Sequence, residues 1–551
     1  MRGTFSFSMV ILGALLTAGC GGGDSSGSGG GGSGSTTTGT GGSGGATATT
    51  ASLKIDTDKG PIQGALLGAT RAFLGVPFAA PPVGDLRWKP PAPHAAWSDT
   101  LDASVKGRPC TQMGGFSNKV DPKTGEDCLT LNVWTPASPA SDKLPVMVWI
   151  HGGGFTVGSG SDAAYDGQAL SEATGHIVVS VNYRLGPLGF LALPALESED
   201  AAHPSTGDYG LEDQRAALAW VQANAAALGG DPGNVTIFGE SAGGISVCSH
   251  LVSPKSKGLF QRAIIESGPC DTGADKAKAE AQGADFLKAL GCDADPDPVA
   301  CARAKPAEDV LLALPTSLDF IFGGTKWFPV VDGWNLPDVP GKLLADGKME
   351  SVPVVLGTNK DEGTLFLYLA GTEGKVPDDA AFLAFSEKLV PGHGADIVAL
   401  YPPATYGSAQ AAAAASLGDA VFVCPARRAA RAIAKTGNPT YLYHFTYVPD
   451  GALLGDMGSF HSAEVKYVLG NSSQLLPKPL TDEELPLEAT MMGYWGRHAE
   501  SGDPNGKDAF AWPKYAEASD ENIVLDLTVS KQTGLAKAEC DFWDTIPLSI
   551  Q

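Results

Sequence analysis

Short runs of apolar, often β-branched residues recur along the chain and alternate with segments of helical periodicity. Such runs are typical of buried strands, and they cover residues 146–150, 177–181, 235–238, 262–265 and 352–356. The clearest helical segment is 211–228, where Ala217, Leu218, Trp220, Val221 and Ala225 recur at helical spacing, and the alanine-rich stretch 411–415 favours helix by propensity. Strands that alternate with helices indicate an α/β fold, with a large, mostly parallel central sheet flanked by helices.

The first twenty residues follow a different pattern. Met1 and Arg2 precede an apolar run from Phe5 to Ala18, which is too short to span a bilayer because a spanning helix needs roughly 20 residues. A charged start, an apolar middle and small residues before a cleavage site are typical of a signal peptide. The segment 16–20 also resembles a bacterial lipobox, with Cys20 as the acylated residue, although Thr17 stands where that pattern prefers Leu, Val or Ile. The alternative is an ordinary signal peptide with an incidental cysteine.

Residues 21–52 are predicted to be a flexible tether. The part from Gly21 to Thr50 consists almost entirely of Gly, Ser, Thr and Ala, so it has too little apolar surface to offset the entropy of ordering. A tether of this kind would hold a folded domain clear of a membrane to which the acylated Cys20 is attached. No second linker and no internal repeat follow, so the remainder, 53–551, is expected to form one large domain.

Charge and cysteine usage exclude several classes of function. The chain has 38 basic and 61 acidic residues and a formal charge of −23, so phosphate backbones would repel it and nucleic-acid binding is not expected. Apart from Cys20 there are eight cysteines, and neither CxxC nor HExxH spacing occurs, so no metal site or dithiol redox site is predicted. An even number of cysteines in an exported chain indicates disulfides.

The segment 239–243 reads Gly-Glu-Ser-Ala-Gly and lies between the strand predicted at 235–238 and a helical run at 245–251. GxSxG between a strand and a helix is typical of a nucleophile elbow, in which a sharp turn lifts the serine hydroxyl above the sheet. Only glycine fits two positions before and after Ser241, because a Cβ there would clash as helix and strand approach. A glycine-rich turn around a serine can be only a turn, but these flanks favour Ser241 as a nucleophile.

A second glycine motif, 149–155, reads Trp-Ile-His-Gly-Gly-Gly-Phe and follows another predicted strand. Consecutive glycines allow backbone N–H groups to point into a cavity, where they stabilise negative charge on a carbonyl oxygen. We assign these oxyanion donors as the N–H groups of Gly153, Gly154 and Ala242, the last at the start of the following helix. A nucleotide-binding loop is disfavoured because the GxGxxG spacing and a following helix are missing.

With these two motifs the chain resembles the type-B carboxylesterase/lipase family, which includes cholinesterases and fungal lipases. The resemblance extends from about Leu53 to Trp543 and rests on many further motifs in one order, at 73–79, 81–84, 126–133, 182–186 and 229–232. It implies the α/β-hydrolase fold and a catalytic domain over 53–551. It also implies a serine carboxylic-ester hydrolase that needs no cofactor and acts on a small-molecule ester.

In this fold the acid and then the histidine follow the serine along the chain. His461 lies in a loop, 458–464, that resembles the histidine loop of the family, whereas His444 lies in a predicted strand, His498 in a predicted helix and His393 in an exposed turn. The acid is expected after the strand ending at Leu356, where Asp361 and Glu362 are adjacent and spacing alone cannot choose between them. The family pattern places the acid directly before a glycine, which selects Glu362 and leaves Asp361 facing solvent.

The resemblance also implies structural pairs. The disulfides are Cys110–Cys128, Cys292–Cys301 and Cys424–Cys540, and the ion pairs are Arg87–Glu126 and Arg184–Asp213. Cys248 and Cys270 have no partner in the family and are either buried thiols or a fourth bridge. Glu240 matches an acidic residue often found beside the nucleophile, and it either tunes the site or pairs with a polar neighbour.

Substrate and location are less closely determined. Cholinesterases carry a tryptophan between the cysteines of the first bridge, but none of the residues between Cys110 and Cys128 is Trp, so cation–π recognition there is unsupported. Phe322, Trp327 and Phe328 precede the segment where the family forms its acyl pocket, and they either line it or belong to the core. We expect an exported protein, secreted or held at the cell envelope by its lipid, that hydrolyses small to medium acyl esters. The alternatives are a lipase and a non-catalytic binding or adhesion protein.

Overall fold

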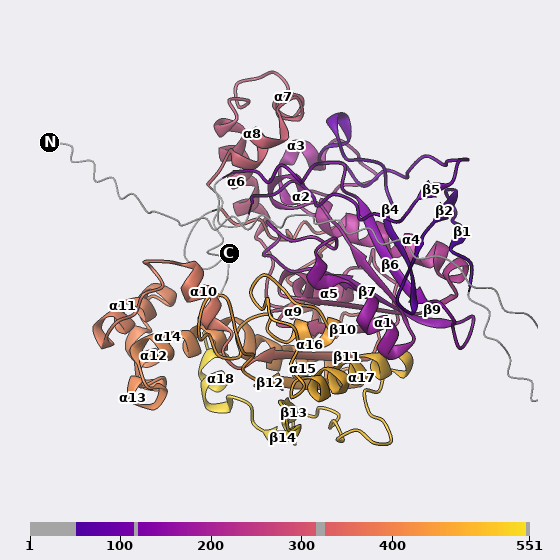
Figure 1. The fold of residues 1–551 in the computed structure, drawn as a ribbon. Coiled ribbons are helices and arrows are strands. Elements are labelled where there is room, and N and C mark those ends of the chain that lie inside the picture. Colours follow the sequence, from indigo (N-terminus) through magenta and orange to yellow (C-terminus); the bar gives the residue numbers. More distant parts are fainter. Residues whose placement is uncertain (1–50, 115–118, 316–324, 547–551) are drawn as a thin grey trace, which may run out of the picture. The chain divides into compact units, whose positions relative to one another are not determined.

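A computed structural model describes residues 51–114, 119–315 and 325–546. Cys20, nearly all of the predicted tether and Phe322 lie outside the described residues. The segment from Thr49 to Gln551 is one compact unit, built around a large sheet with helices on both faces (Figure 1).

The large sheet has eleven strands in the order β14-β13-β12-β11-β10-β9-β7-β8-β6-β4-β3. Six of its ten neighbouring pairs are parallel and four, toward the two edges, are antiparallel, so the prediction of a mostly parallel α/β sheet is confirmed. A separate small sheet has the order β1-β2-β5. The strands are β1 (Lys54–Asp56), β2 (Pro61–Gln63), β3 (Ala65–Leu67), β4 (Thr70–Pro77), β5 (Leu101–Asp102), β6 (Thr130–Pro136), β7 (Leu144–Ile150), β8 (Ile177–Val181), β9 (Gly230–Glu240), β10 (Arg262–Glu266), β11 (Val354–Asn359), β12 (Thr440–Phe445), β13 (Glu521–Leu525) and β14 (Ser530–Thr533).

The strand expected at 352–356 is displaced. β11 begins at Val354 and continues to Asn359. Pro353 explains the later start, because proline has no N–H with which to join the hydrogen-bond ladder. The extension carries the strand toward the loop that holds the two candidate acids.

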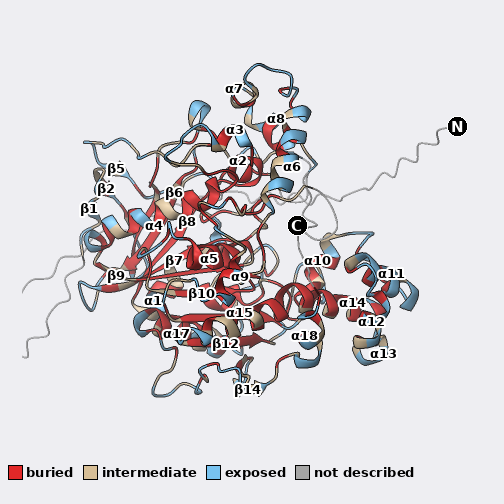
Figure 2. Ribbon diagram, turned by 180° about the vertical axis from the view of Figure 1, so that it is seen from behind, coloured by how far each residue is buried: buried red, intermediate tan, exposed pale blue. Residues whose placement is uncertain are grey.

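Side chains alternate between the two faces of the sheet, and each face is covered by its own helices. On one face the inward residues of β7 and β9 pack in one core with α4, α5, α9 and α15, and on the other face they pack with α1, α16 and α17. Figure 2 shows the buried residues concentrated on the sheet and on these helices. The bounds are α1 (Gln168–Thr174), α4 (Tyr209–Leu228), α5 (Ala242–Val252), α9 (Pro340–Ala345), α15 (Cys424–Lys435), α16 (Val465–Leu469) and α17 (Leu485–Ser501).

A helical region with its own small core follows the acid loop. It consists of α10 (Gly363–Leu369), α11 (Asp379–Leu389), α12 (Gly394–Leu400), α13 (Pro403–Tyr406), α14 (Ala409–Gly418) and the π-helical turn η3 (Asp419–Val423), and α18 (Lys537–Trp543) packs against it. The continuous helical stretch from Ala409 to Lys435 is long and apolar enough to cross a membrane, but most of it is buried inside the protein, which is typical of a core helix. The remaining helices are α2 (Gly186–Phe190), α3 (Pro194–Glu197), α6 (Lys276–Ala289), α7 (Pro298–Arg303) and α8 (Ala307–Leu312), with 3-10 turns η1 (Gly84–Leu86) and η2 (Ala163–Tyr165).

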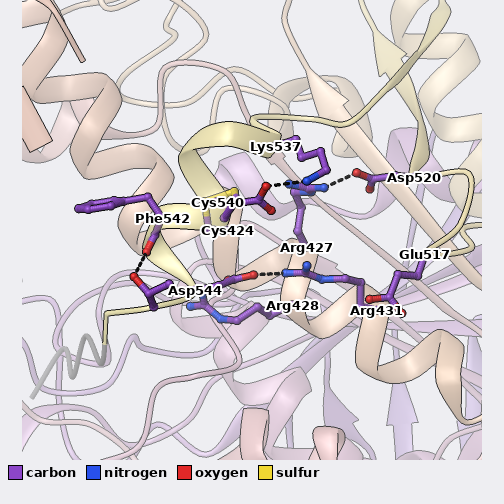
Figure 3. A network of polar contacts seen from close by, with 12 residues as sticks. Cys424, Arg427, Arg428, Arg431, Glu517, Asp520, Lys537, Cys540, Phe542 and Asp544 are labelled. Atoms are coloured by element: carbon purple, nitrogen blue, oxygen red, sulfur yellow. Dashed lines mark hydrogen bonds and ion pairs between the residues drawn. A yellow bond between two sulfur atoms is a disulfide. The ribbon is translucent and has the colours of Figure 1, made fainter. Parts of the chain in front are cut away.

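Disulfides and buried ion pairs hold this frame together. The three bridges that the resemblance implied are present, and Cys248 and Cys270 form a fourth, which settles the alternative left open for them. The ion pairs Arg87–Glu126 and Arg184–Asp213 are also present, at 2.6 and 2.7 Å. Figure 3 shows that the Cys424–Cys540 bridge lies beside a set of arginines on α15, so α18 is attached to α15 covalently and, through Asp544 at its end, by charge.

Candidate active site

Ser241 lies on the turn between β9 and α5. Its φ of 56° and ψ of −120° place it in a region that non-glycine residues rarely adopt. The turn is fixed by hydrogen bonds on both sides, because the Ser241 N–H donates to the carbonyl oxygen of Glu266 at 2.9 Å and its own carbonyl accepts from Ile245 at 2.8 Å. The strained conformation lifts the side chain out of the sheet into a cavity.

The glycines of this turn are needed for close packing. A Cβ on Gly239 would lie 2.5 Å from the carbonyl oxygen of Ile150, and a Cβ on Gly243 would overlap the same oxygen. Both strand β7 and helix α5 therefore approach β9 at distances that only glycine permits. The Cβ clash that the sequence predicted at Gly239 and Gly243 is therefore confirmed by the packing.

The oxyanion loop follows β7 and approaches the same cavity. Gly153 and Gly154 have φ values of 106° and 58°, so both turn in a region open to glycine. Among the hydrogen bonds of the described residues, none uses the N–H groups of Gly153, Gly154 or Ala242 as a donor. Gly154, Ser241 and Ala242 line one cavity, and Gly153 lines a second, adjoining one. Unpaired N–H groups beside a serine hydroxyl are suited to stabilise an oxyanion.

Glu362 and His461 are brought together from residues 99 positions apart. The Nδ1 of His461 lies 2.6 Å from Oε2 of Glu362, and the other carboxylate oxygen accepts from the Ser267 hydroxyl at 2.5 Å and from the Asn359 N–H at 2.8 Å. Glu362 is fully buried. The carboxylate is therefore fixed by three donors, and it fixes the tautomer and orientation of the imidazole in turn.

Asp361 corrects an expectation. It does not simply face solvent: it is half-buried, and its carboxylate accepts a hydrogen bond from the N–H of Ser459 at 2.8 Å. Its own N–H donates to the carbonyl of Ser459 at 2.9 Å. Of two adjacent acids, Glu362 therefore holds the imidazole and Asp361 holds the loop that carries it.

The other imidazole nitrogen of His461 faces Glu240. Nε2 lies 3.0 Å from Oε1 of Glu240, and within the described residues no hydrogen bond joins it to the Ser241 hydroxyl. The structure thus places His461 beside the residue that precedes Ser241, not on the serine itself. Hydrogen bonds between a nucleophile and its base often tighten only when substrate is bound. Both alternatives left open for Glu240 hold, since it pairs with the imidazole and its charge raises the pKa of His461.

Further buried acids surround this pair and were not found from sequence. Glu266 is the register partner of Glu240, and Gly357 links it across β11 to Tyr443 on β12, so the side chains of Glu240, Glu266 and Tyr443 lie on one face of the sheet. Glu464 lies close by, hydrogen-bonded to Asn359. Glu266 could have been found only from the register of neighbouring strands, which no local sequence motif encodes.

Among the described residues, His461 is the only basic group that forms ion pairs with this cluster of acids, through Glu240 and Glu362. Burial lowers the pKa of His461, but the charges of Glu240 and Glu362 outweigh it and raise the pKa well above 6.5. Burial raises the pKa of Glu266 to about 8, with a further contribution from Glu240, and burial likewise raises the pKa of Glu464 well above its usual value. The raised pKa values favour the protonated, neutral forms of Glu266 and Glu464, because buried like charges cannot all ionise.

A compact apolar cavity of about 40 Å³ lies beside Ser241. Besides Gly154, Ser241 and Ala242 it is lined by one polar residue, Thr272, and by a set of apolar residues, Ile245, Pro269, Phe328, Phe366, Val421 and Phe422. Phe328 therefore lines the cavity, whereas Trp327 belongs to the core, where its ring packs against Phe286. Phe366 and Phe422 were missed from sequence, and their rings also pack against His461, at 4.8 and 4.7 Å between centroids.

The three other candidate histidines lie elsewhere. His444 is in β12 and His498 in α17, both buried, and burial lowers their pKa values to about 4 and about 3. His393 is exposed next to Asp396. No cluster of three His, Cys, Asp or Glu side chains suited to a metal ion occurs among the residues that the structure describes.

Comparison with known proteins gives a consistent family. The sequence profile of the Carboxylesterase family matches residues 51–543. The chain is 36% identical to the para-nitrobenzyl esterase of Bacillus subtilis (strain 168), over 86% of this chain and 95% of the relative. It is 35% identical to the acetylcholinesterase of Bungarus fasciatus, over 89% of this chain and 86% of the relative.

Solved structures agree with this grouping. A PNB esterase superposes with a TM-score of 0.78 at 34% identity, covering 89% of this chain and 99% of that one. A thermophilic PNB esterase gives a TM-score of 0.77 at 34% identity, covering 90% of this chain and 100% of the other. The α/β-hydrolase fold and the serine ester hydrolase class expected from sequence are thereby confirmed, and the chain belongs to the carboxylesterase family.

Proposed function

We propose that the protein hydrolyses esters of small to medium acids through an acyl-enzyme on Ser241, with His461 as general base and acid and Glu362 as the group that orients it. The observation that carries the proposal is the placement of His461. Its Nδ1 is held by Glu362 at 2.6 Å, and its Nε2 lies 3.0 Å from the residue directly before the strained serine.

The chemistry follows from this arrangement. The imidazole turns from Glu240 to the neighbouring Ser241 hydroxyl and removes its proton as the oxygen attacks the ester carbonyl. The N–H groups of Gly153, Gly154 and Ala242 stabilise the oxyanion that forms. His461 then protonates the leaving alcohol, and water repeats the cycle on the acyl-enzyme.

The compact cavity supports a short acyl chain. It holds about 40 Å³ and is lined by Phe328, Phe366 and Phe422, and the last two rings stack at 5.2 Å between centroids. Apolar walls favour an alkyl group by burial, but a long chain would have to displace these rings. The proposal is therefore an esterase with a preference for short acids.

The test compares p-nitrophenyl butyrate with p-nitrophenyl palmitate, with and without a serine-directed organophosphate. We expect faster hydrolysis of butyrate, loss of activity after treatment, and phosphorylation of Ser241 in a digest analysed by mass spectrometry. Ser241→Ala should lose at least about 10⁴-fold in kcat with an unchanged circular dichroism spectrum. Preference for palmitate would indicate a lipase, no hydrolysis of either ester a binding protein, and full activity in Ser241→Ala would overturn the assignment.

We also propose that the chain is exported and acylated at Cys20, with residues 21–52 as a flexible tether. The apolar start, the resemblance to a lipobox and the tether composition support this, and four disulfides in the described residues suit an oxidising compartment. Mass spectrometry of the mature N-terminal peptide should find a lipid on Cys20, and Cys20→Ser should release the protein from the membrane fraction. An unmodified N-terminus beginning elsewhere would refute the proposal.

A further inference from the structure

The Cys248–Cys270 bridge connects two segments that both line the compact cavity of the active site. Cys248 is on α5, the helix that begins at the serine turn, and Cys270 follows β10. Ile245, three residues before Cys248, lines the cavity, and residues three apart in a helix are neighbours on its surface. Pro269 and Thr272, before and after Cys270, also line the cavity. The bridge is therefore a covalent link between two walls of one cavity.

Close packing at two glycines sets how near these walls approach each other. A Cβ on Gly268 would lie 2.4 Å from the carbonyl carbon of Gly244, and a Cβ on Gly244 would lie 2.8 Å from the Cα of Gly268. The backbones of α5 and of the segment after β10 therefore approach at a distance that only glycine permits. Cys248 lies one helical turn after Gly244, and Cys270 follows soon after Gly268. The bridge continues this contact as a bond, and both of its cysteines are buried.

The two ends of the segment 267–274 are fixed independently of the bridge. At its start the hydroxyl of Ser267 donates to Glu362 at 2.5 Å. At its end the N–H of Ala274 donates to the carbonyl of Pro329 at 2.8 Å. Loss of the bridge would therefore loosen the middle of the segment, which lines the cavity, while the contact to the catalytic acid remains.

The other contacts from the middle of this segment lead to different helices. The N–H of Gly341, in α9, donates to the carbonyl of Cys270 at 2.7 Å. The carboxylate of Asp271 pairs with Arg428 on α15 at 2.6 Å, and both side chains are partly exposed, so this pair adds little stability. Because neither contact involves α5, the position of the middle of the segment against that helix depends on the glycine contact and on the bridge.

We propose that the Cys248–Cys270 bridge sets the acyl-chain specificity of the enzyme. It holds the wall that contains Pro269 and Thr272 against α5, and it keeps the cavity small enough to exclude longer acyl chains. The cavity holds about 40 Å³, so a small displacement of one wall adds room for further methylene groups. Both cysteines act through the wall and are positioning residues. This inference rests on the proposed function, because it requires the acyl group to occupy the compact cavity.

The test compares kcat/KM for the p-nitrophenyl esters of acetic and octanoic acid in the full chain, so that only the acyl group changes. Cys248→Ala/Cys270→Ala should raise the ratio of octanoate to acetate by about five-fold or more, because each methylene group that enters the cavity adds binding in the transition state. Hydrolysis of the acetate should change little, because Ser267 still holds Glu362. An unchanged ratio would overturn the proposal, and so would equal losses on both esters, which a merely structural bridge predicts.

Cys292→Ala/Cys301→Ala is the matched control. This bridge spans nine residues, and neither cysteine nor a sequence neighbour is among the described residues that line the cavity. Its removal should leave the ratio of octanoate to acetate constant. A rise in this ratio equal to that of the Cys248→Ala/Cys270→Ala variant would mean that general loosening explains the effect and would overturn the proposal.

A second pair of substitutions covers a failure to fold. Cys248→Ser/Cys270→Ser removes the bond but nearly keeps the size of both side chains, and it should raise the ratio in the same direction. Circular dichroism and thermal unfolding establish that each variant is folded. If neither pair folded while the control did, the bridge would be required for folding and not for specificity, and the proposal would fail.

Thr272→Phe tests the wall itself. A larger side chain at this position should fill the cavity and lower the ratio of octanoate to acetate, but without the bridge the wall can yield and the loss should be smaller. The effects of Thr272→Phe and of bridge removal on the ratio should therefore depart from additivity by about two-fold or more. Additive effects would show that the bridge does not hold this wall. Inactivity of the unchanged chain on both esters would instead refute the proposed function.

Discussion

On α15, the guanidinium groups of Arg427, Arg428 and Arg431 each pair with a carboxylate (Figure 3), whereas two buried glutamates, Glu240 and Glu362, share the imidazole of His461. Both regions collect charged side chains from distant parts of the sequence. On α15 positive and negative groups are matched, and the bridge Cys424–Cys540 lies among them. Near His461 the acids outnumber the cations, and buried Glu266 and Glu464 have no cationic partner among the described residues.

This difference separates stability from reactivity. A matched ion pair lowers the cost of burying each charge and leaves neither group reactive. An imidazole beside unmatched carboxylates has a perturbed pKa and is ready to move protons, which is typical of functional sites. Substitutions should therefore reduce activity in one region and stability in the other.

The largest effect is expected for Glu362→Gln. The imidazole would keep its place but lose the carboxylate that fixes its tautomer and stabilises its charge, so kcat should fall by about 10³- to 10⁴-fold. The measurement is steady-state hydrolysis of p-nitrophenyl butyrate, with thermal unfolding of the same sample as control. A loss smaller than ten-fold would mean that another group orients His461.

Next in size is Asp213→Ala, in the buried frame. Both oxygens of Asp213 bind Arg184, at 2.7 Å each, and the variant would leave the guanidinium buried and unpaired. The free energy of unfolding should fall by about 3–5 kcal/mol, as measured by denaturant titration. The double variant Arg184→Met/Asp213→Leu should recover much of this loss, because it removes both charges. If the single and double variants were equally unstable, lost packing would explain the effect and the comparison would fail.

A smaller loss of stability is expected from Cys424→Ala/Cys540→Ala. The bridge spans 116 residues, and removing a long-range bridge typically costs about 2–4 kcal/mol. The chain should stay folded and active, because the arginine pairs of Figure 3 still hold α18 to α15. Cys292→Ala/Cys301→Ala is the matched control, since that bridge spans only nine residues and should cost less. The observation against this account would be a larger loss from the short bridge, measured by the same denaturant titration.

The smallest effect is a shift in pH dependence for Glu240→Gln. Only neutral His461 can act as a base, so kcat/KM should rise with pH through the pKa of His461, which lies well above 6.5. Removing an anion 3.0 Å from Nε2 lowers that pKa, and the acid limb of the profile should move to lower pH by about one unit. Stability depends on pH in the opposite direction to kcat/KM. Because the pKa of His461 is raised in the folded state, its protonation stabilises the folded protein fully below pH 6.5. This stabilisation is lost as the pH rises through the folded-state pKa.

Glu266→Gln is the control for this shift. Burial raises the pKa of Glu266 to about 8, so below that pH it is already neutral and the amide replaces one neutral group with another. The acid limb should stay in place. A shift as large as that of Glu240→Gln would show that Glu266 is ionised and that the acids around His461 carry more charge than we infer.

Much of the fold could be predicted from sequence because its signals are local. Apolar runs marked the central strands, and β8 has the predicted bounds. α4 begins at Tyr209, two residues before the predicted helix, and ends at Leu228 as predicted. The error at β11 came from Pro353, whose missing N–H excludes it from the ladder. The choice of the glycines around Ser241 was also local, because a Cβ clash depends only on the turn and its two neighbours.

Which residues contact one another within the active site could not be predicted from local sequence. Spacing could not choose between Asp361 and Glu362, and the divided roles of these acids appear only where the end of β11 meets the histidine loop. The Cys248–Cys270 bridge likewise depends on how α5 lies against the segment after β10. Glu266 and Tyr443 carry no motif at all, and only strand register brings them into one row with Glu240.

By itself, then, the sequence determined the class of sheet, the strained serine turn, the glycine loop and, through resemblance to a family, the acid and the base. These depend on backbone geometry and side-chain size within a few residues, which local sequence encodes. Only the tertiary structure decided which way Nε2 of His461 faces, which acids share its charge, and which side chains line the cavity beside Ser241. Those properties depend on distances between residues remote along the chain, and packing alone sets them.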